Sequence, residues 1–345
     1  MLMKAAWFHR FGGPEVMVYE ETTAPTPGPG EALVRVRAVG VNHVDLDVRA
    51  GTARIPLTLP HILGREFAGE VAALGSAGSP HKAGDRVWVE SRLACGQCEF
   101  CLTGRDNLCA TGGFFGMQLP GGYADYVKVP IASIQPLPAQ VGFEAAAASQ
   151  IAFGTAWHVL FNRGGLKAGQ TVLIQAAGSG IGSAAVQVAK FAGATVIATA
   201  GSAQKLERAR ALGADHLINY TQDQNFAAQV LALTAGQGVD LVMEHIGGHV
   251  FTQSLECLKT DGTMVTVGAH AGEVVTLDII PFFRRQLKLV GSRNATLFEI
   301  RTVMRLVAAG RLKPVIHASF PLSQAAEAHR VVGSRDIFGK VVLVP

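Results

Sequence analysis

Residues 171–205, TVLIQAAGSGIGSAAVQVAKFAGATVIATAGSAQK, decide the fold of this chain. The stretch 171–177 is a largely apolar run of the kind that forms a buried parallel strand. A glycine-rich turn follows, then a helical stretch at 182–192 and a second apolar strand at 195–199. This order of strand, turn, helix and strand predicts a βαβ unit in an α/β protein with a doubly wound parallel sheet.

The pattern continues toward the C-terminus. A second helix is expected at 203–212, ending at Gly213, a residue well suited to close a helix. Further strands with helices between them are expected at 216–220, 239–243, 263–267 and 287–290, and one more at 338–344. Such alternation indicates a Rossmann dinucleotide-binding domain.

The first 150 residues have a different character, rich in glycine, proline and β-branched residues. Residues 31–41 alternate as a half-buried strand does, and 69–75 and 84–89 read as short strands between turns. This region predicts a compact, mostly β domain.

Composition limits the classes of partner. The chain has 345 residues, a net charge of +4 and 30 lysines and arginines without a basic block, so no nucleic-acid partner is expected. No apolar run reaches the roughly 18 residues of a membrane-spanning helix. The N-terminus becomes charged before a signal-like core develops, which favours a cytoplasmic protein acting on a small-molecule substrate.

The turn after the first strand has the context that a dinucleotide fingerprint requires. Small residues let the backbone approach a pyrophosphate, and the start of a helix favours its negative charge. An ordinary tight turn is the alternative reading. The candidate cofactor contacts in this turn are Ala177, Ser179, Gly180, Ile181 and Gly182.

The end of the second strand bears on the choice of nucleotide. An NAD site usually places an acid about 20 residues beyond the glycines, to bind the ribose hydroxyls. No acid stands between Val196 and Lys205, whereas Gly201, Ser202 and Lys205 offer space, a hydroxyl and a cation. The sequence therefore predicts NADPH over NADH, although Lys205 could also be an ordinary solvated helix residue.

Four of the five cysteines form a cluster at Cys95, Cys98, Cys101 and Cys109. Such spacing completes a tetrahedron of thiolates around Zn²⁺ and leaves no position for a substrate, so one structural zinc per chain is expected in a lobe at 91–112. Unligated thiols or an iron–sulfur cluster are the alternatives.

Motifs spread over nearly the whole chain resemble the medium-chain dehydrogenase/reductase superfamily, that is, the zinc-containing alcohol dehydrogenases and quinone oxidoreductases. Besides the cysteine lobe they are PGPGEALV (27–34), GVNHVD (40–45), GREFAGEV (64–71), GDRV (84–87), GYADYV (122–127) and FGKVV (338–342).

The resemblance implies a GroES-like catalytic domain of residues 1–152 and 293–345, with the Rossmann domain inserted at 153–292. It also implies a homodimer or homotetramer and cofactor contacts from His43 and Tyr220. Three further candidate cofactor contacts complete the expected set: Thr155, Gly247 and Gly268.

The chain departs from the zinc alcohol dehydrogenases where they bind their catalytic metal. It carries Asn42, Arg65 and Ile151 at or near positions that would hold the ligands. Asparagine is a poor zinc ligand, arginine stays protonated and isoleucine has no donor atom. Asn42 resembles the zinc-free quinone oxidoreductases instead.

These losses predict an NADPH-dependent reductase of quinones or α,β-unsaturated carbonyl compounds, since reduction of an activated double bond needs no Lewis acid. Arg65 and Asn42 are expected to stabilise the developing oxyanion, and Asp45 and Glu66 are candidate acid/base groups. Alternatively, Arg65 pairs with Asp45 or Glu66 and only holds its loop. His245 is a candidate proton donor.

Two other functions remain open. One is a zinc-type alcohol or aldehyde dehydrogenase, with a metal held by Glu66 and water. The other is a weakly catalytic NADPH-binding protein, because a fold alone does not guarantee chemistry.

Overall fold

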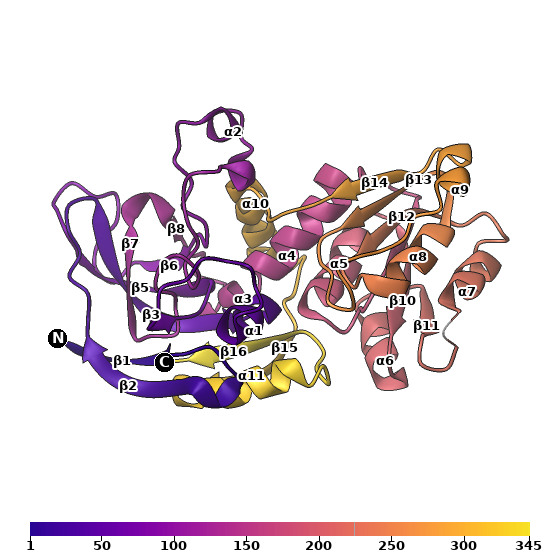
Figure 1. The fold of residues 1–345 in the computed structure, drawn as a ribbon. Helices are drawn as coiled ribbons and strands as arrows, with labels where there is room; N and C mark the ends of the chain where they lie inside the picture. The colour runs from indigo at the N-terminus through magenta and orange to yellow at the C-terminus, as the bar shows by residue number, and fades with distance from the viewer. Residues whose placement is uncertain (224) are drawn as a thin grey trace. The chain divides into compact units, whose positions relative to one another are not determined.

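The computed structural model describes residues 1–223 and 225–345, and these divide into two compact units. Unit 1 comprises Met1–Gln150 and Met304–Pro345, and unit 2 comprises Ile151–Val303. The inserted unit thus runs from 151 to 303, against the 153–292 expected from the sequence. The second junction falls inside helix α10 (Leu297–Ala308), a continuous helix that offers no turn or composition change as a boundary signal. Both chain termini lie in unit 1 (Figure 1).

Unit 1 is mostly β structure, as the sequence predicts. Its strands are β1 (Leu2–Phe8), β2 (Met17–Thr23), β3 (Glu31–Val41), β4 (His61–Ile62), β5 (Glu66–Leu74), β6 (Arg86–Val89), β7 (Tyr126–Pro130), β8 (Ile134–Pro136), β15 (Ile316–Pro321) and β16 (Lys340–Val344). Its helical elements are η1 (Pro14–Val16), α1 (His43–Ala50), α2 (Glu99–Leu102), η2 (Asp106–Leu108), η3 (Ile131–Ser133), α3 (Phe143–Ala147), η5 (Leu322–Gln324) and α11 (Ala325–Gly333).

The larger sheet of unit 1 has the strand order β15-β16-β3-β5-β6-β8, with β7 also paired to β3, and β2-β1-β4 form a smaller sheet. Strand β16 runs antiparallel to β3 and pairs Val341 with Val41, so the C-terminal tail completes a sheet begun near the N-terminus. Strand β3 is buried over most of its length rather than on alternate residues, because the core of unit 1 lies on both of its faces. The short helix α2 stands on a loop that projects from this sheet (Figure 1).

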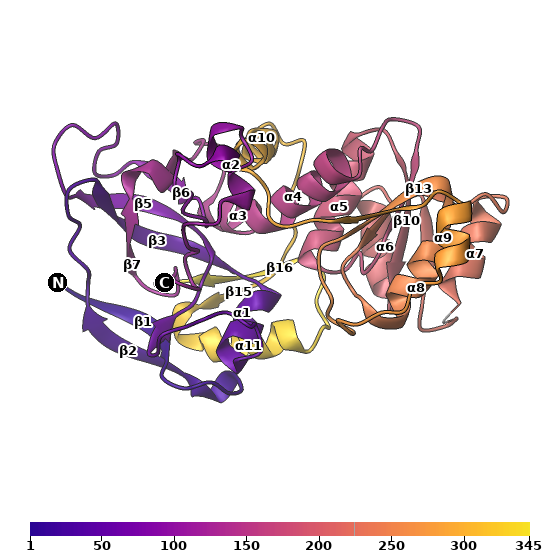
Figure 2. The ribbon, with the colours of Figure 1, turned by 45° about the horizontal axis from the view of Figure 1, so that its top comes forward.

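Unit 2 is a doubly wound parallel sheet with helices packed on it (Figure 2). Its strands are β9 (Thr171–Ile174), β10 (Thr195–Ala200), β11 (His216–Asn219), β12 (Val239–Glu244), β13 (Leu258–Thr266) and β14 (Lys288–Gly291). Its helical elements are α4 (Gln150–Trp157), the π-helix η4 (His158–Arg163), α5 (Gly180–Phe191), α6 (Ala203–Ala211), α7 (Phe226–Leu233), α8 (Gly248–Glu256), α9 (Ile279–Arg284) and most of α10.

The strand order β11-β10-β9-β12-β13-β14 confirms the predicted fold. The chain moves outward from β9 through β10 to β11, then returns to β12 on the other side of β9. In such sheets the crevice beyond the carboxyl ends of the two central strands is where ligands bind.

The glycine-rich turn explains how α5 packs so closely on β9. A Cβ atom on Gly182 would lie 2.2 Å from the carbonyl oxygen of Ala176, so a larger residue would force the helix away from the strand. Ser179 caps the helix, since its Oγ accepts a hydrogen bond from the Gly182 amide at 2.9 Å.

Within the described residues, no helix combines the length and apolar character needed to cross a membrane.

Candidate functional site

The parallel sheet of unit 2 gathers most of the predicted cofactor residues at one edge. The glycine-rich turn follows β9, Gly201 follows β10, Tyr220 follows β11, and Gly247 and Gly268 follow β12 and β13. Because the carboxyl ends of parallel strands share an edge, these residues lie along one edge of the sheet, with the turns after β9 and β12 at its switch point. Thr155 is buried in α4 of the same unit, and His43 begins α1 in unit 1; their cofactor contacts stay predictions.

The turn after β10 provides a second helix start at this edge. Ser202 caps α6, and its Oγ accepts the amide hydrogen of Lys205 at 3.3 Å. A Cβ atom on Gly201 would lie 2.9 Å from the hydroxyl of Tyr220, so glycine lets the two segments meet. The start of α6 is suited to binding a phosphate group. It offers the Ser202 hydroxyl, the Lys205 side chain and the helix N-terminus, and its first turn has no acidic side chain.

The loop after β12 is held by a residue that sequence reasoning missed. Glu244 is fully buried, and its Oε1 accepts the amides of Ile246 at 2.6 Å and Gly247 at 2.7 Å. Its Oε2 accepts the hydroxyl of Thr266 at 3.2 Å, and burial raises the pKa of the carboxyl. Glu244 thus fixes the backbone at the crevice, and an acid ending an apolar strand was the available signal.

The four clustered thiols of unit 1 have the arrangement that zinc requires. Cys98 Sγ lies 3.5 Å from Cys101 Sγ, which lies 3.9 Å from Cys95 Sγ, and all four sulfurs including that of Cys109 lie within 4.8 Å of one another. Zn–S bonds of about 2.3 Å in a tetrahedron separate sulfurs by about 3.8 Å. Hydrogen bonds, above all with Thr111, lower the pKa of the Cys95 thiol to about 5 and favour its thiolate.

Two arginines join the cysteine lobe to the rest of unit 1. Arg92 donates hydrogen bonds to the carbonyl oxygens of Cys109 and Asp106, the latter at 3.1 Å. The Arg92 guanidinium lies 4.8 Å from the ring centroid of Phe114, and that of Arg65 lies 4.6 Å from the same ring. Phe114 therefore holds Arg65 in place by a cation–π contact, and Arg92 links the same ring to the cysteine lobe.

A buried ionic cluster surrounds Asn42. The Asn42 Nδ2 donates to Glu66 Oε1 at 3.0 Å, and the Lys340 Nζ donates to Asn42 Oδ1 at 2.7 Å. The same ammonium forms an ion pair with Glu66 and donates to the carbonyl oxygen of Val41 at 2.9 Å. Glu66 is fully buried and Lys340 is 6% exposed, so neither charge is stabilised by bulk water.

This cluster changes the expected role of Asn42. The second Asn42 Nδ2 hydrogen faces the carbonyl oxygen of Gly40 at 3.4 Å, so both ends of the amide are engaged inside the protein. The geometry therefore does not support the prediction that Asn42 donates to a substrate. Lys340 was not predicted as a site residue, although a lysine opening the otherwise apolar strand KVVLV was a signal for a buried pair.

Asp45 is fully buried at the start of α1. Its Oδ2 accepts the Asn42 amide at 2.8 Å and the Tyr123 hydroxyl at 3.5 Å. Tyr123 also bonds His329 Nε2 at 3.1 Å, and His329 Nδ1 faces the Arg49 guanidinium at 2.8 Å. Tyr123 is thus part of a buried polar chain.

Burial raises the pKa of Asp45 to about 6, and the neighbouring charges of Arg65 and Lys340 oppose the rise. The electrostatic attraction between Arg65 and Asp45 agrees with the alternative in which Arg65 holds its loop. Because Asp45 is fully enclosed and hydrogen-bonded to its own helix, it positions its neighbours rather than reaching a ligand.

A surface hollow of about 340 Å³ also lies in unit 1, at the opposite end of α1 from Asn42. Its lining includes Phe11, Val48 and Leu57 and none of the predicted catalytic residues. The hollow therefore does not mark the chemistry predicted from the sequence.

Comparison with known proteins places both units in known families. Residues 28–139 match the alcohol dehydrogenase GroES-like domain, and residues 180–309 match the zinc-binding dehydrogenase family. The quinone oxidoreductase of Pongo abelii is 30% identical over 99% of this chain and 98% of its own length.

Solved structures agree with these matches. A crystal structure of an NAD-dependent alcohol dehydrogenase is 42% identical with a TM-score of 0.95, over 99% of this chain and 100% of that chain. A cobalt- and zinc-bound thermostable alcohol dehydrogenase from Pyrobaculum aerophilum is 33% identical with a TM-score of 0.91, over the full length of both chains.

Proposed function

The chain belongs to the medium-chain dehydrogenase/reductase superfamily, and on this premise we propose that it is an NADPH-dependent reductase of quinones or α,β-unsaturated carbonyl compounds. The observation that carries the proposal is the contact of Lys340 with both Asn42 and Glu66. The Lys340 ammonium group neutralises the Glu66 carboxylate, and a divalent metal bound here would need that negative charge.

The electrostatics of this region support a reaction without a catalytic metal. Lys340 and Arg65 bring two buried cations close to Glu66 and Asp45, and a further divalent cation would be repelled by both. Arg65 cannot become a ligand because a guanidinium stays protonated. A metal held by Glu66 and water is therefore disfavoured, because Glu66 Oε1 already bonds Asn42 and Lys340.

Arg65 is the residue that we assign to the developing negative charge. When bound, NADPH would supply a hydride to the β-carbon of an enone or to a quinone, and negative charge would then develop on the carbonyl oxygen. The Arg65 guanidinium, held by Phe114 and attracted by Asp45, stabilises that oxygen. Asn42, Asp45 and Glu66 act as positioning residues, and a proton from water completes the reduced product.

The cofactor preference rests on the turn after β10. Ser202 and Lys205 at the start of α6 favour a 2′-phosphate, and no carboxylate lies between Val196 and Lys205 to bind free ribose hydroxyls. The related structure described as an NAD-dependent alcohol dehydrogenase makes the nucleotide preference a necessary part of the test.

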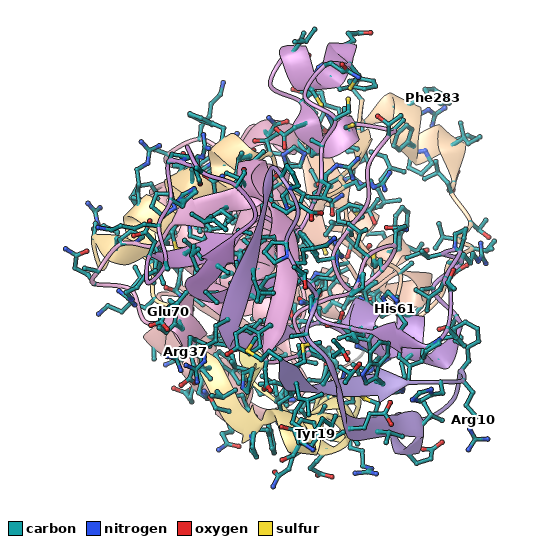
Figure 3. The ribbon with its side chains drawn as sticks, turned by 90° about the vertical axis from the view of Figure 1, so that its left-hand side faces the viewer. Arg10, Tyr19, Arg37, His61, Glu70 and Phe283 are labelled. Atoms are coloured by element: carbon teal, nitrogen blue, oxygen red, sulfur yellow. The ribbon has the colours of Figure 1, made fainter. Side chains whose placement is uncertain are left out.

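Two further assignments complete the proposal. Cys95, Cys98, Cys101 and Cys109 hold one structural Zn²⁺ per chain, which ties the lobe together and exposes no position to substrate. The protein assembles through unit 2, where β14 ends the strand order and α9 exposes Ile279, Ile280 and Phe283. Phe283 is labelled in Figure 3. An open sheet edge beside exposed apolar side chains favours pairing with a second copy.

The proposal is tested by NADPH oxidation with quinones and enones, alongside alcohol-driven reduction of NADP⁺ and NAD⁺. We expect turnover in the first assays that survives a metal chelator. The Arg65→Ala variant should lose kcat by roughly 10²-fold, the usual effect of removing one oxyanion donor, while its Kd for NADPH is unchanged. Arg65→Lys should recover part of the loss.

The matched control is Arg37→Ala, which removes an arginine paired at the surface of unit 1 with Glu70 at 2.8 Å (Figure 3). Its turnover should equal that of the wild type.

The relatives described as alcohol dehydrogenases favour a second candidate, a zinc-type alcohol dehydrogenase. Chelator-sensitive alcohol oxidation would establish that candidate, and NADPH binding without any turnover would leave a binding protein.

A further inference from the structure

The imidazole of His245 occupies the crevice edge between two turns. His245 directly follows β12 and is 5% exposed. Its Nε2 lies 3.4 Å from Ser179 Oγ, in the turn after β9. A Cβ atom on Gly268, after β13, would lie 3.4 Å from the His245 Cβ atom. The ring is therefore enclosed by the turns of the strands on both sides of β12.

The other ring nitrogen has no partner of its own. Within residues 1–223 and 225–345, no group forms a hydrogen bond with the buried His245 Nδ1. Burial, aided by the nearby charge of His270, lowers the pKa of His245 to about 4, so the ring is neutral at pH 7. A neutral imidazole makes a poor proton donor for catalysis, but it offers one N–H and one bare nitrogen for hydrogen bonding.

Ser179 indicates which nitrogen carries the hydrogen. Its Oγ already accepts the Gly182 amide at 2.9 Å, and its hydroxyl hydrogen is then available for His245 Nε2. That arrangement makes Nε2 the acceptor and leaves the hydrogen on Nδ1. A buried N–H without an acceptor is unfavourable, and it calls for a group that is not part of the described chain.

The topology indicates which group this is. In a doubly wound sheet a dinucleotide crosses the switch point, with one nucleotide on each half of the sheet. The glycine-rich turn and the candidate phosphate contacts at Ser202 and Lys205 belong to the β9–β11 half. Strand β12 begins the other half, so His245 lies on the half of the sheet where the nicotinamide mononucleotide would bind.

We propose that His245 binds the nicotinamide mononucleotide half of the cofactor, donating its Nδ1–H to an oxygen of that half while Ser179 orients the ring through Nε2. The proposal rests on the dinucleotide binding assigned above. It names a specific donor in the crevice, whereas the glycines contribute only close backbone approach.

Two amide variants separate the ring nitrogens. His245→Asn places an amide near the position of Nδ1, and His245→Gln places one near Nε2. The test is calorimetric titration of each full-length variant with NADPH and with 2′,5′-ADP, which carries only the adenosine half. Thermal unfolding confirms that each variant is folded, and His245→Val serves as a variant without any hydrogen-bonding group.

We expect His245→Gln and His245→Val to weaken NADPH binding by roughly three- to tenfold, the effect of one lost buried hydrogen bond. His245→Asn should stay within about twofold of the wild type, and 2′,5′-ADP affinity should not change in any of them. The control His216→Asn, in β11, should bind NADPH as the wild type does.

Wild-type NADPH affinity in both His245→Gln and His245→Val would overturn the inference while leaving the proposed function intact. Equal losses of 2′,5′-ADP affinity would also overturn it, because the histidine would then act on the whole turn. A wild-type protein that binds no dinucleotide would remove the proposed function and the inference together.

Discussion

The Lys340 Nζ atom lies 2.7 Å from the Asn42 Oδ1 atom, although 298 residues separate the two along the chain. This contact joins the first residue of β16 to the cap of α1, and the same ammonium pairs with the buried carboxylate of Glu66. The C-terminal segment therefore completes the ionic cluster of unit 1 as well as its sheet.

Replacing this lysine should destabilise unit 1. Lys340→Met leaves the fully buried Glu66 without its cation, and loss of one partner of a buried pair costs about 3–5 kcal/mol. Urea unfolding should show a lower midpoint, and the double variant Lys340→Met/Glu66→Gln should recover most of the loss. The control Lys4→Met removes an exposed contact of 3.8 Å to Glu21 and should change the stability by less than about 1 kcal/mol. An unchanged midpoint in Lys340→Met would show that the pair has no net role.

The cysteine cluster predicts one zinc per chain by elemental analysis. Cys109→Ser should lower the zinc content and bring unfolding of the lobe to a lower temperature, because three thiolates bind zinc less tightly than four. The control Cys257→Ser changes the fully buried cysteine of unit 2 and should keep one zinc. Two zinc ions per wild-type chain would contradict the reading of Asn42 and Arg65 and favour the alcohol dehydrogenase candidate.

The nucleotide-binding unit was predictable because its signals are local. The apolar strands, the glycine-rich turn and Gly213 after α6 all lie within a few residues of the features they specify. The strands β1 (Leu2–Phe8) and β2 (Met17–Thr23) were not predicted, although glycines and a proline at 12–14 separate them and a segment rich in proline and glycine follows at 25–30. Their pairing depends on contacts with each other and with β4, which only the folded chain supplies.

The site in unit 1 was predictable in its residue types but not in its partners. Motif positions singled out Asn42, Asp45, Arg65 and Glu66, yet the partners Lys340 and His329 come from the last 20 residues of the chain. Local spacing carries no information about such distant contacts. The cysteines were different, because three of the four ligands come from one short segment whose spacing itself reports the site.

The cofactor preference predicts a measurable change on removing one charge. Lys205→Ala should weaken NADPH binding by roughly fivefold to tenfold and leave NADH binding nearly unchanged, because only NADPH carries the 2′-phosphate. Titrations of both nucleotides should be made at fixed low salt, since salt screens exposed charges. Lys190→Ala, at the other end of α5 from the turn, is the control and should bind both nucleotides as the wild type does. Tighter wild-type binding of NADH than of NADPH would contradict the preference.

His329 predicts a stability loss in acid. Burial, with a smaller effect of Arg49, lowers the pKa of His329 to about 3. In the unfolded chain His329 takes up a proton near pH 6.5, and in the folded chain only near pH 3. The free energy of unfolding should therefore fall by roughly a few kcal/mol as the pH drops from the first value to the second. His329→Gln keeps a donor for Tyr123 and should flatten the profile of unfolding free energy against pH in this window. Equal slopes in the wild type and His329→Gln would refute the assignment.

Assembly through the β14 edge predicts that a charge on α9 produces monomers. The Phe283 side chain is 58% exposed, and Ile279 and Ile280 beside it are 64% and 55% exposed, which makes an apolar surface at the end of the sheet order. Phe283→Glu would bury a carboxylate in the interface, so light scattering after size-exclusion chromatography should show the mass of one chain where the wild type shows two or four. Phe298→Glu, at a 71% exposed position of α10, is the matched control and should keep the wild-type mass. If Phe283→Glu kept the wild-type mass, the copies would have to meet through another surface, and β14 would remain an open edge within unit 2.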